Sequence, residues 1–292
     1  MNILILVVFL LFGFLSDSLP AGAGDIVIKG PVVTRFVVEK NIHPQSKTIE
    51  IGWWMKRKEG WHTYWDSPGD VGLPPTLEWD LPEGITFRSM LYAPPQLVKM
   101  FKVFAHGHRG ETLFVCNFNV ERDLHEDEEL IFKAKSSWLA CYTTCLPTHA
   151  NMQISIPVKS KTEIDTEWDQ HFQKFWREQP AKAKASWLSQ CQAFIRSEKN
   201  GEKEYAVIRF PCPDNTQLPT FRFFTHGRFV RSNIFQVPKR IFRRNDKDLL
   251  EISMELSYWR DSNQKELSGL LYRSDGWPEE TSNFYEITLP LR

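Results

Sequence analysis

Alternation of apolar and polar residues is the dominant pattern of this chain, and it predicts β-strands whose two faces meet different surroundings. The alternation is clearest from Thr48 to Lys56 and returns from Glu111 to Asn119. In the first segment it predicts one buried face, made of Ile49, Ile51, Trp53 and Met55. In the second it places Cys116 between two phenylalanines, which indicates an inert core thiol.

Similar apolar patterns recur from end to end of the chain, so the predicted fold is mainly β. Further strands are predicted over residues 25–38, 76–79, 130–138, 152–158, 205–210, 249–258, 267–272 and 284–289. In the segment 249–258 the inward side chains are expected to be Ile252, Met254, Leu256 and Tyr258. Turns between strands are marked by proline and glycine, as at Pro68-Gly69 and Pro213-Asp214.

One segment has a helical period instead. Trp168, Phe172, Phe175 and Trp176 repeat at the spacing of one helix face, and the helix should end at Gln179-Pro180. We therefore predict a domain boundary near residue 160. The first domain would span 24–160, and a connector helix with a second domain would span 161–292.

The amino terminus has the pattern of an export signal. Residues 3–15 are apolar and uncharged, and Ala21-Gly22-Ala23 follows as a small-residue cleavage pattern. The sequence predicts a signal peptide over residues 1–23 and a soluble exported protein. An uncleaved amino-terminal anchor is the alternative.

Composition narrows the classes of function. The chain has 36 basic and 36 acidic residues, so it carries no electrostatic footprint for nucleic acid and no polybasic membrane arm. Its 11 Trp and 21 Phe, with 18 Pro and 15 Gly spread along the chain, suit a two-sheet core with many turns. No cofactor is predicted.

Two of the five cysteines carry the most informative motif, WLACYTTCLP over residues 138–147. A bridge between Cys141 and Cys145 would close a ring of five residues, which the chain-entropy model credits with only about 2 kcal/mol. Such a bridge is a poor staple, and short strained bridges are the reducible kind used for exchange. A redox pair and a local staple are both consistent with the spacing. Cys191, in an apparent helix, and Cys212 are predicted to be unpaired or core.

Metal binding is a third interpretation of the same motif. Cys141, Cys145 and His149 are spaced by four, His106 and His108 could join them, and thiolate with imidazole suits Cu(I) or Zn(II). The aromatic segment 60–75 is a further candidate feature. Its Trp61, Tyr64 and Trp65 either plug the end of a core or cover a site.

Position along the chain predicts which sulfur would meet a partner. Cys141 directly follows a strand and should be covered, whereas Cys145 lies beyond the polar turn Tyr142-Thr143-Thr144. Cys145 is therefore the predicted partner-facing sulfur and Cys141 the resolving one. No neighbouring Lys, Arg or helix start is evident that would lower the pKa of either thiol.

Several segments carry a family resemblance. Residues 61–85, 92–95, 138–147 and 267–277 resemble the amino-terminal periplasmic region of DsbD-like thiol:disulfide interchange proteins. The similarity is greatest to the ScsB (suppressor of copper sensitivity) type with its disulfide bond corrector domain. The resemblance implies two immunoglobulin-like β-sandwich domains joined by a short helix, in the periplasm. A Tyr-Gly-Tyr segment of the family corresponds to His106-Gly107-His108, which extends the predicted site cover to both histidines.

The resemblance also implies a function. The Cys141/Cys145 pair would relay electrons from a thioredoxin-like or DsbD/CcdA-type membrane electron donor to a periplasmic disulfide isomerase-like acceptor. The sequence has no membrane conduit and no Cys-x-x-Cys domain, so both are expected to be separate proteins. Whether the chain is itself an enzyme, as the protein-disulfide reductase component of such a relay, is left open. A Cu(I)- or Zn-binding periplasmic protein of copper-stress type and a non-catalytic structural β-domain protein are the alternatives.

Overall fold

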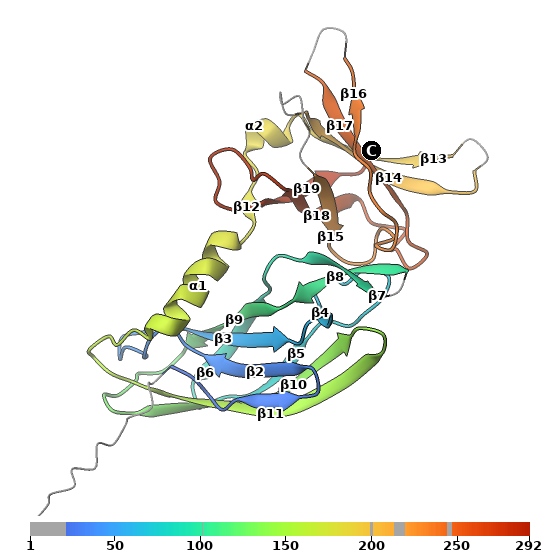
Figure 1. Cartoon of the computed structure of the whole chain (residues 1–292). Coiled ribbons are helices and arrows are strands. Elements are labelled where there is room, and N and C mark those ends of the chain that lie inside the picture. Colours follow the sequence, from blue (N-terminus) through green and yellow to red (C-terminus); the bar gives the residue numbers. More distant parts are fainter. Residues whose placement is uncertain (1–21, 101, 199–200, 213–219, 244–246) are drawn as a thin grey trace, which may run out of the picture.

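The computed structural model describes residues 22–100, 102–198, 201–212, 220–243 and 247–292. It contains four mainly antiparallel β-sheets and two helices, which confirms the mainly β fold (Figure 1). The predicted signal peptide lies outside the described residues except for Gly22 and Ala23. No helix in the described part of the chain has the length and apolarity needed to cross a membrane.

Two facing sheets form the amino-terminal sandwich. The first has the order β1-β2-β3-β9-β6, and the second has the order β11-β10-β4-β8-β7, with β5 paired to β10. The strands of the first sheet are β1 Val27–Lys29, β2 Val32–Val37, β3 Thr48–Arg57, β6 Ile85–Leu91 and β9 Glu111–Val120. Those of the second are β4 His62–Tyr64, β5 Thr76–Asp80, β7 Gln96–Met100, β8 Val103–Arg109, β10 Glu129–Cys141 and β11 Cys145–Pro157.

The core between these sheets follows the predicted alternation. Side chains of β3 and β9 pack against those of β10 and β11, and Trp53, Phe114, Cys116 and Phe132 are completely buried. The four residues predicted for the inner face of β3 are all buried there. Burial of large aromatic side chains is the main stabilising contribution to such a core.

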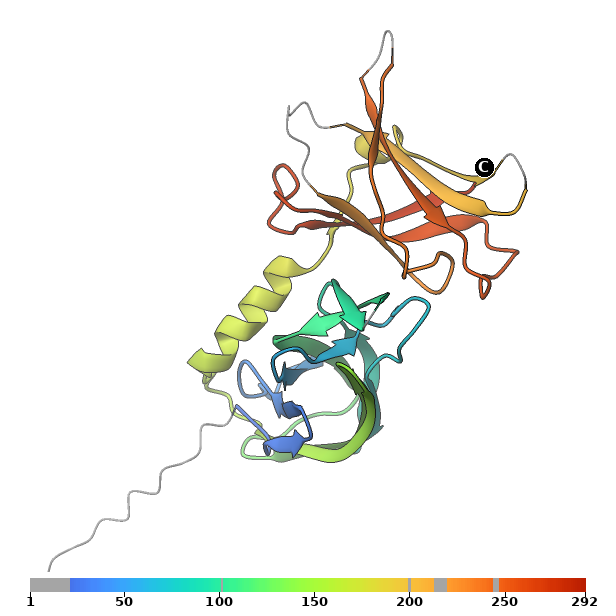
Figure 2. The ribbon, with the colours of Figure 1, turned by 45° about the vertical axis from the view of Figure 1, so that its right-hand side comes forward.

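Helix α1 (Thr166–Glu178) leads from the first sandwich to the second, as Figures 1 and 2 show. Asp165 caps its start by accepting hydrogen bonds from the backbone of Glu167 and Trp168. Trp168, Phe172 and Phe175 pack on the outer face of the first sheet, as predicted. Trp176 is 41% exposed and contacts Phe175, so its predicted burial is wrong. It lies only one position from Phe175 and points around the helix, away from the sheet.

Gly52 on β3 makes the close approach of α1 possible. A Cβ there would lie 2.7 Å from Leu113, 2.8 Å from Val37 and 3.0 Å from Phe172. We expect Gly52→Ala to destabilise the protein by about 1–3 kcal/mol through overpacking. Urea unfolding would measure this, with Thr48→Ala, an exposed position on the same strand, as the control. An unchanged unfolding midpoint for Gly52→Ala would contradict the expectation.

The carboxy-terminal sandwich has two further sheets, β12-β19-β18-β15 and β13-β14-β17-β16. The elements are β12 Ala181–Lys182, α2 Ala185–Leu188, β13 Gln192–Ser197, β14 Glu204–Pro211, β15 Phe221–Thr225, β16 Lys239–Ile241, β17 Leu249–Glu255, β18 Glu266–Arg273 and β19 Phe284–Pro290. Tyr258 is 85% exposed because β17 ends at Glu255, so its predicted inward position is wrong. Cys191 follows the short helix α2 and is not within it.

Candidate functional site

The predicted cysteine pair lies at the tip of the longest hairpin of the fold. β10 and β11 pair in continuous register from Glu129 opposite Pro157 to Cys141 opposite Cys145. The turn between them is Tyr142-Thr143-Thr144, closed by a hydrogen bond of 3.0 Å from the Tyr142 amide to the Thr144 carbonyl. This confirms the prediction that the pair sits between the strand that delivers it and the strand that leaves it.

Cys141 and Cys145 form a disulfide in the structure, and their two sulfurs have different environments. Cys141 is completely buried, whereas Cys145 is exposed. The burial difference agrees with the prediction from the chain order. A nucleophile approaching from solvent therefore meets the sulfur of Cys145 first.

A small apolar cluster surrounds the buried sulfur. Tyr64 of β4, Val98 of β7 and Ala105 of β8 pack with Cys141. Met100, at the end of β7, belongs to the edge of this cluster, and its Sδ lies 3.4 Å from the Sγ of Cys145. The end of the β7–β8 hairpin thus reaches the exposed side of the disulfide.

Two further side chains lie in line with the cysteine pair, on the neighbouring strands of the sheet. His62 of β4 is directly opposite Cys141, and Arg109 of β8 is directly opposite His62. Directly paired residues of antiparallel strands project on the same face, with Cβ atoms about 5 Å apart. Cys145, Cys141, His62 and Arg109 therefore form one row over four adjacent strands, which we call the cross-strand row.

His62 is 1% exposed, and its Nδ1 has no hydrogen-bond partner among the described residues. Its ring packs edge-on against Tyr64, with 5.3 Å between ring centroids. Burial, with the nearby charges of Arg109 and Arg57, lowers the pKa of His62 to about 4, so the imidazole is neutral at pH 7. No cation near the pair is evident from the sequence, because Arg109 reaches the row only through strand pairing.

The remaining predicted cover residues have other contacts. Trp61 is half-buried against the main core, and its ring centroid is 6.2 Å from that of Tyr142 in the hairpin turn. His108 packs edge-on against Phe114, with its Nε2 2.9 Å from the Ala93 carbonyl oxygen. His106 packs against Phe224 of the second sandwich. Alternation along β8 places both histidines on the face opposite Arg109, and therefore away from the disulfide.

The segment 60–75 has two separate structural roles. Its β4 part lines the disulfide through Tyr64, while Trp65 packs with Phe224 and Leu270 of the second sandwich. Beyond it, the Asp70 amide donates a hydrogen bond of 2.9 Å to Ser232 Oγ. The two interpretations offered for these aromatics thus apply to different residues of the same segment.

This division predicts different effects for two neighbouring substitutions. Tyr64→Ala should speed nonspecific oxidation of the reduced pair, because it uncovers Cys141. Trp65→Ala should leave that rate unchanged and mainly lower stability, by about 3–5 kcal/mol for a buried aromatic. Oxidation rate and thermal melting, measured on both variants, test the assignment. Equal oxidation rates for wild type and Tyr64→Ala would contradict it.

The other three cysteines are buried, as predicted for core thiols. Burial raises the pKa of Cys116 far above its usual value and that of Cys191 to about 12. A buried thiol with a raised pKa forms little thiolate and is inert in exchange.

The described residues are not arranged as a metal site. No group of three or more His, Cys, Asp and Glu side chains among them is placed to hold an ion. His149 is exposed on β11, four residues along the strand from Cys145, which corresponds to about 13 Å. The spacing of four residues that suggested a set of metal ligands therefore separates Cys145 and His149 along an extended strand.

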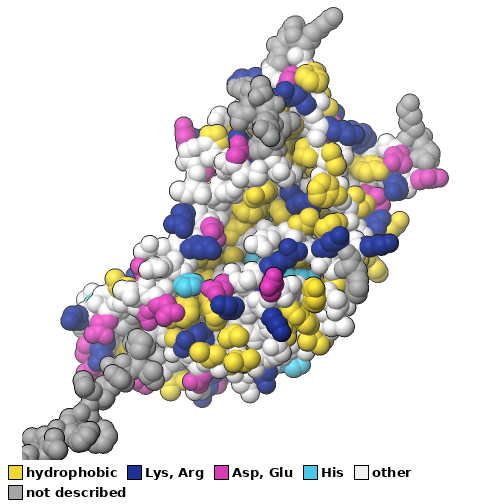
Figure 3. All heavy atoms as spheres, in the orientation of Figure 1, with side chains coloured by type: hydrophobic (Ala, Val, Ile, Leu, Met, Phe, Trp, Pro, Cys, Tyr) yellow, Lys and Arg dark blue, Asp and Glu magenta, His cyan; other side chains and the backbone are white. Residues whose placement is uncertain are grey.

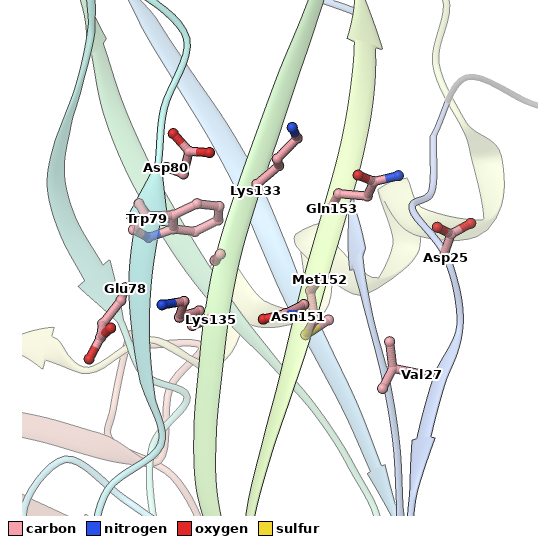
Figure 4. Close-up of a pocket in the computed structure, with 11 residues that line it drawn as sticks. Asp25, Val27, Glu78, Trp79, Asp80, Lys133, Lys135, Asn151, Met152 and Gln153 are labelled. Atoms are coloured by element: carbon pink, nitrogen blue, oxygen red, sulfur yellow. The ribbon is translucent and has the colours of Figure 1, made fainter.

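One cavity of the described structure lies away from the disulfide. It has a volume of about 670 Å³ and includes neither cysteine. Figure 4 shows Lys133 and Lys135 of β10 beside the acidic residues Asp80 and Glu78 of β5. These are opposite charges on paired strand positions, as is common on the solvated face of a sheet.

The first sandwich, which carries the cysteine hairpin, is similar to a domain of the thiol:disulfide interchange proteins. Residues 32–156 match the family model described as "Thiol:disulfide interchange protein DsbD, N-terminal". The match covers the first sandwich from β2 almost to the end of β11 and includes both cysteines. It confirms the resemblance for this part of the chain. No curated protein matches the chain in sequence.

Among solved structures, the chain is similar to the N-terminal periplasmic domain of ScsB from Proteus mirabilis. The identity is 14%, the TM-score is 0.63, and the similarity covers 92% of this chain and 98% of that one. The fold is therefore shared over both sandwiches. The N-terminal domain of Neisseria meningitidis DsbD in the reduced form has 11% identity and a TM-score of 0.24, with 51% of this chain and 97% of that one covered.

Proposed function

We propose that this protein is a thiol:disulfide exchange protein that acts through Cys141 and Cys145. The observation that carries the proposal is a disulfide between an exposed and a buried cysteine at the end of a hairpin that is paired in continuous register. The family match over residues 32–156 supports exchange chemistry in general. The five-residue ring supports it too, because a bridge this short contributes little as a staple.

The two sulfurs have different roles in the proposed exchange. In the dithiol form, the Cys145 thiolate attacks one sulfur of an acceptor disulfide and forms a mixed disulfide. Cys141 then attacks Cys145, the internal bridge forms again, and the acceptor leaves as a dithiol. The internal bridge is reduced when a donor dithiol attacks Cys145 and the same steps run in reverse.

The proposed setting follows the family. The solved ScsB domain is described as periplasmic, and the apolar segment at residues 3–15 is consistent with export of this chain to the periplasm. Thioredoxin-like redox proteins are the expected partners. More specifically, we propose a membrane or thioredoxin-like electron donor and an isomerase-like electron acceptor. We also propose that the domain with the site spans residues 24–160.

A redox titration tests the function. The protein is equilibrated in buffers of increasing reducing strength, and free thiols are then labelled and counted. If the protein acts in exchange, the Cys141–Cys145 bridge should have a reduction potential above the thioredoxin-like value of about −270 mV. Both cysteines should then become labelled together. A bridge that stays closed at that potential would mean a structural staple. Two thiols that bind stoichiometric Cu(I) or Zn(II) in the purified protein would favour the metal-binding alternative.

A further inference from the structure

The resolving step needs a base, and the structure offers a candidate that the sequence did not suggest. Cys141 must lose its proton before it can attack Cys145, because only a thiolate is nucleophilic. Its sulfur is completely buried, and burial disfavours the charged form of a thiol. Solvent hydroxide is not expected to reach it easily. A proton acceptor within the protein would remove this barrier.

We infer that His62 is the proton acceptor for Cys141, an inference that rests on the proposed exchange function. His62 is the cross-strand partner of Cys141, and their side chains project on the same face. Both residues are almost completely buried, and Tyr64 packs against each of them. The Nδ1 of His62 has no hydrogen-bond partner in the described structure, so no contact there competes with a proton from Cys141. A buried polar atom without a partner is uncommon and calls for an explanation.

The charges around His62 suit a transient acceptor. Burial, with the nearby charges of Arg109 and Arg57, keeps the imidazole neutral before the reaction. When Cys141 ionises, its negative charge lies beside the imidazole in a poorly solvated place, where it stabilises the protonated ring strongly. The positive charge of Arg109, in the same row, also favours the thiolate. Arg57 is 3% exposed and has no carboxylate partner in an ion pair among the described residues, so its charge is not cancelled locally.

The step balances in protons and electrons. In the mixed disulfide, the Cys141 thiol gives its proton to His62, and its sulfur attacks the Sγ of Cys145. The Cys141–Cys145 bond forms and the bond from Cys145 to the acceptor sulfur breaks. The acceptor sulfur leaves as a thiolate and takes up a proton as the imidazolium returns to its neutral form. Over both steps, two electrons pass from the dithiol to the acceptor disulfide.

A two-phase exchange assay tests the role of His62. The reduced protein is mixed with a nitrobenzoate disulfide whose released thiolate is coloured. The first release reports attack by Cys145, and the second reports resolution by Cys141. The Cys141→Ser protein identifies the phases, because it should give the first release only. His62→Gln and His62→Phe are the test variants, and His149→Gln, an exposed histidine on β11, is the matched control.

The expected result is a selective loss of the second phase. His62→Gln and His62→Phe should resolve roughly 100-fold more slowly near pH 7, with the first phase little changed. Their resolution rate should rise about tenfold per pH unit, because hydroxide must now take the proton, whereas the wild-type rate should change less. Second phases equal to wild type in both variants, with the same pH profile, would overturn the inference and leave the exchange function intact. Absence of the first phase in wild type would instead refute the exchange function itself.

Discussion

Replacing Cys141 by Ser should trap a long-lived mixed disulfide through Cys145. The exposed thiol can still attack the disulfide of a thioredoxin-like partner, but no neighbouring thiol remains to release the adduct. The expected change is from an adduct too short-lived to detect to near-complete accumulation. Non-reducing electrophoresis and mass measurement of the intact adduct would show it.

The reciprocal variant is the control for this result. In Cys145→Ser the remaining sulfur is completely buried under Tyr64, Val98 and Ala105, so the adduct should form slowly or not at all. Accumulation of adduct in Cys145→Ser, and none in Cys141→Ser, would reverse the assignment of the two sulfurs. The triple Cys→Ala protein at positions 116, 191 and 212 should behave like wild type if it folds.

Acid should destabilise the first sandwich well before its carboxylates titrate. Burial lowers the pKa of His62 and His106 to about 4 and that of His108 to about 3, each from 6.5. Between these values and 6.5, the unfolded chain binds protons that the folded chain does not. The stability contributed by the three neutral histidines is therefore complete above pH 6.5 and is lost as the pH falls towards 4. Each histidine contributes a slope of about 1.4 kcal/mol per pH unit, or about 4 for all three.

Urea unfolding at several pH values between 7 and 5 would measure this slope. His108→Gln should reduce this slope by about one third, because the unfolded chain then binds two extra protons relative to the folded chain and not three. His149→Gln, at an exposed site, should leave the slope unchanged. Equal stability at pH 7 and pH 5 would show that the buried histidines take up protons without unfolding.

Much of the fold follows from patterns that are local in the sequence. The alternation in β3 and β9 correctly identified the core residues, and the apolar spacing located α1. Trp176 and Tyr258 were misplaced because a side chain near the end of an element is free to leave the buried face. Strand β15 was not predicted, because Phe221–Thr225 is buried throughout and shows no alternation of apolar and polar residues.

The site was predictable only in part, for a related reason. Cys141 and Cys145 are close in the chain, so their pairing and the exposure of Cys145 could be inferred from sequence. His62 and Arg109 join them only through the register of β4 with β10 and β8, which no spacing in the sequence encodes. A polar His62 within the aromatic run Trp61–Trp65 was the one available signal. His106 and His108 were chosen instead, although β8 turns them away from the disulfide.

The mixed charge of the visible surface also bears on the function. Figure 3 shows basic and acidic side chains interspersed over both sandwiches on this face, in keeping with the balanced composition. Such a surface provides little long-range electrostatic steering. Recognition of a redox partner is therefore expected to depend on short-range contacts around the hairpin tip, including Tyr142 and Leu146, which are 50% and 41% exposed.

The long register of β10 with β11 has a consequence for the reduced protein. Because strand pairing along the whole hairpin places Cys141 opposite Cys145, we expect the two thiols to remain neighbours after reduction. The effective molarity of one thiol at the other is then high, as for other well-oriented intramolecular reactions. In a mixed disulfide between Cys145 and a partner, the Cys141 thiol would always be close enough to attack and release the partner. Encounters should accordingly be brief, and turnover should be limited by how often partners arrive and not by how long they stay.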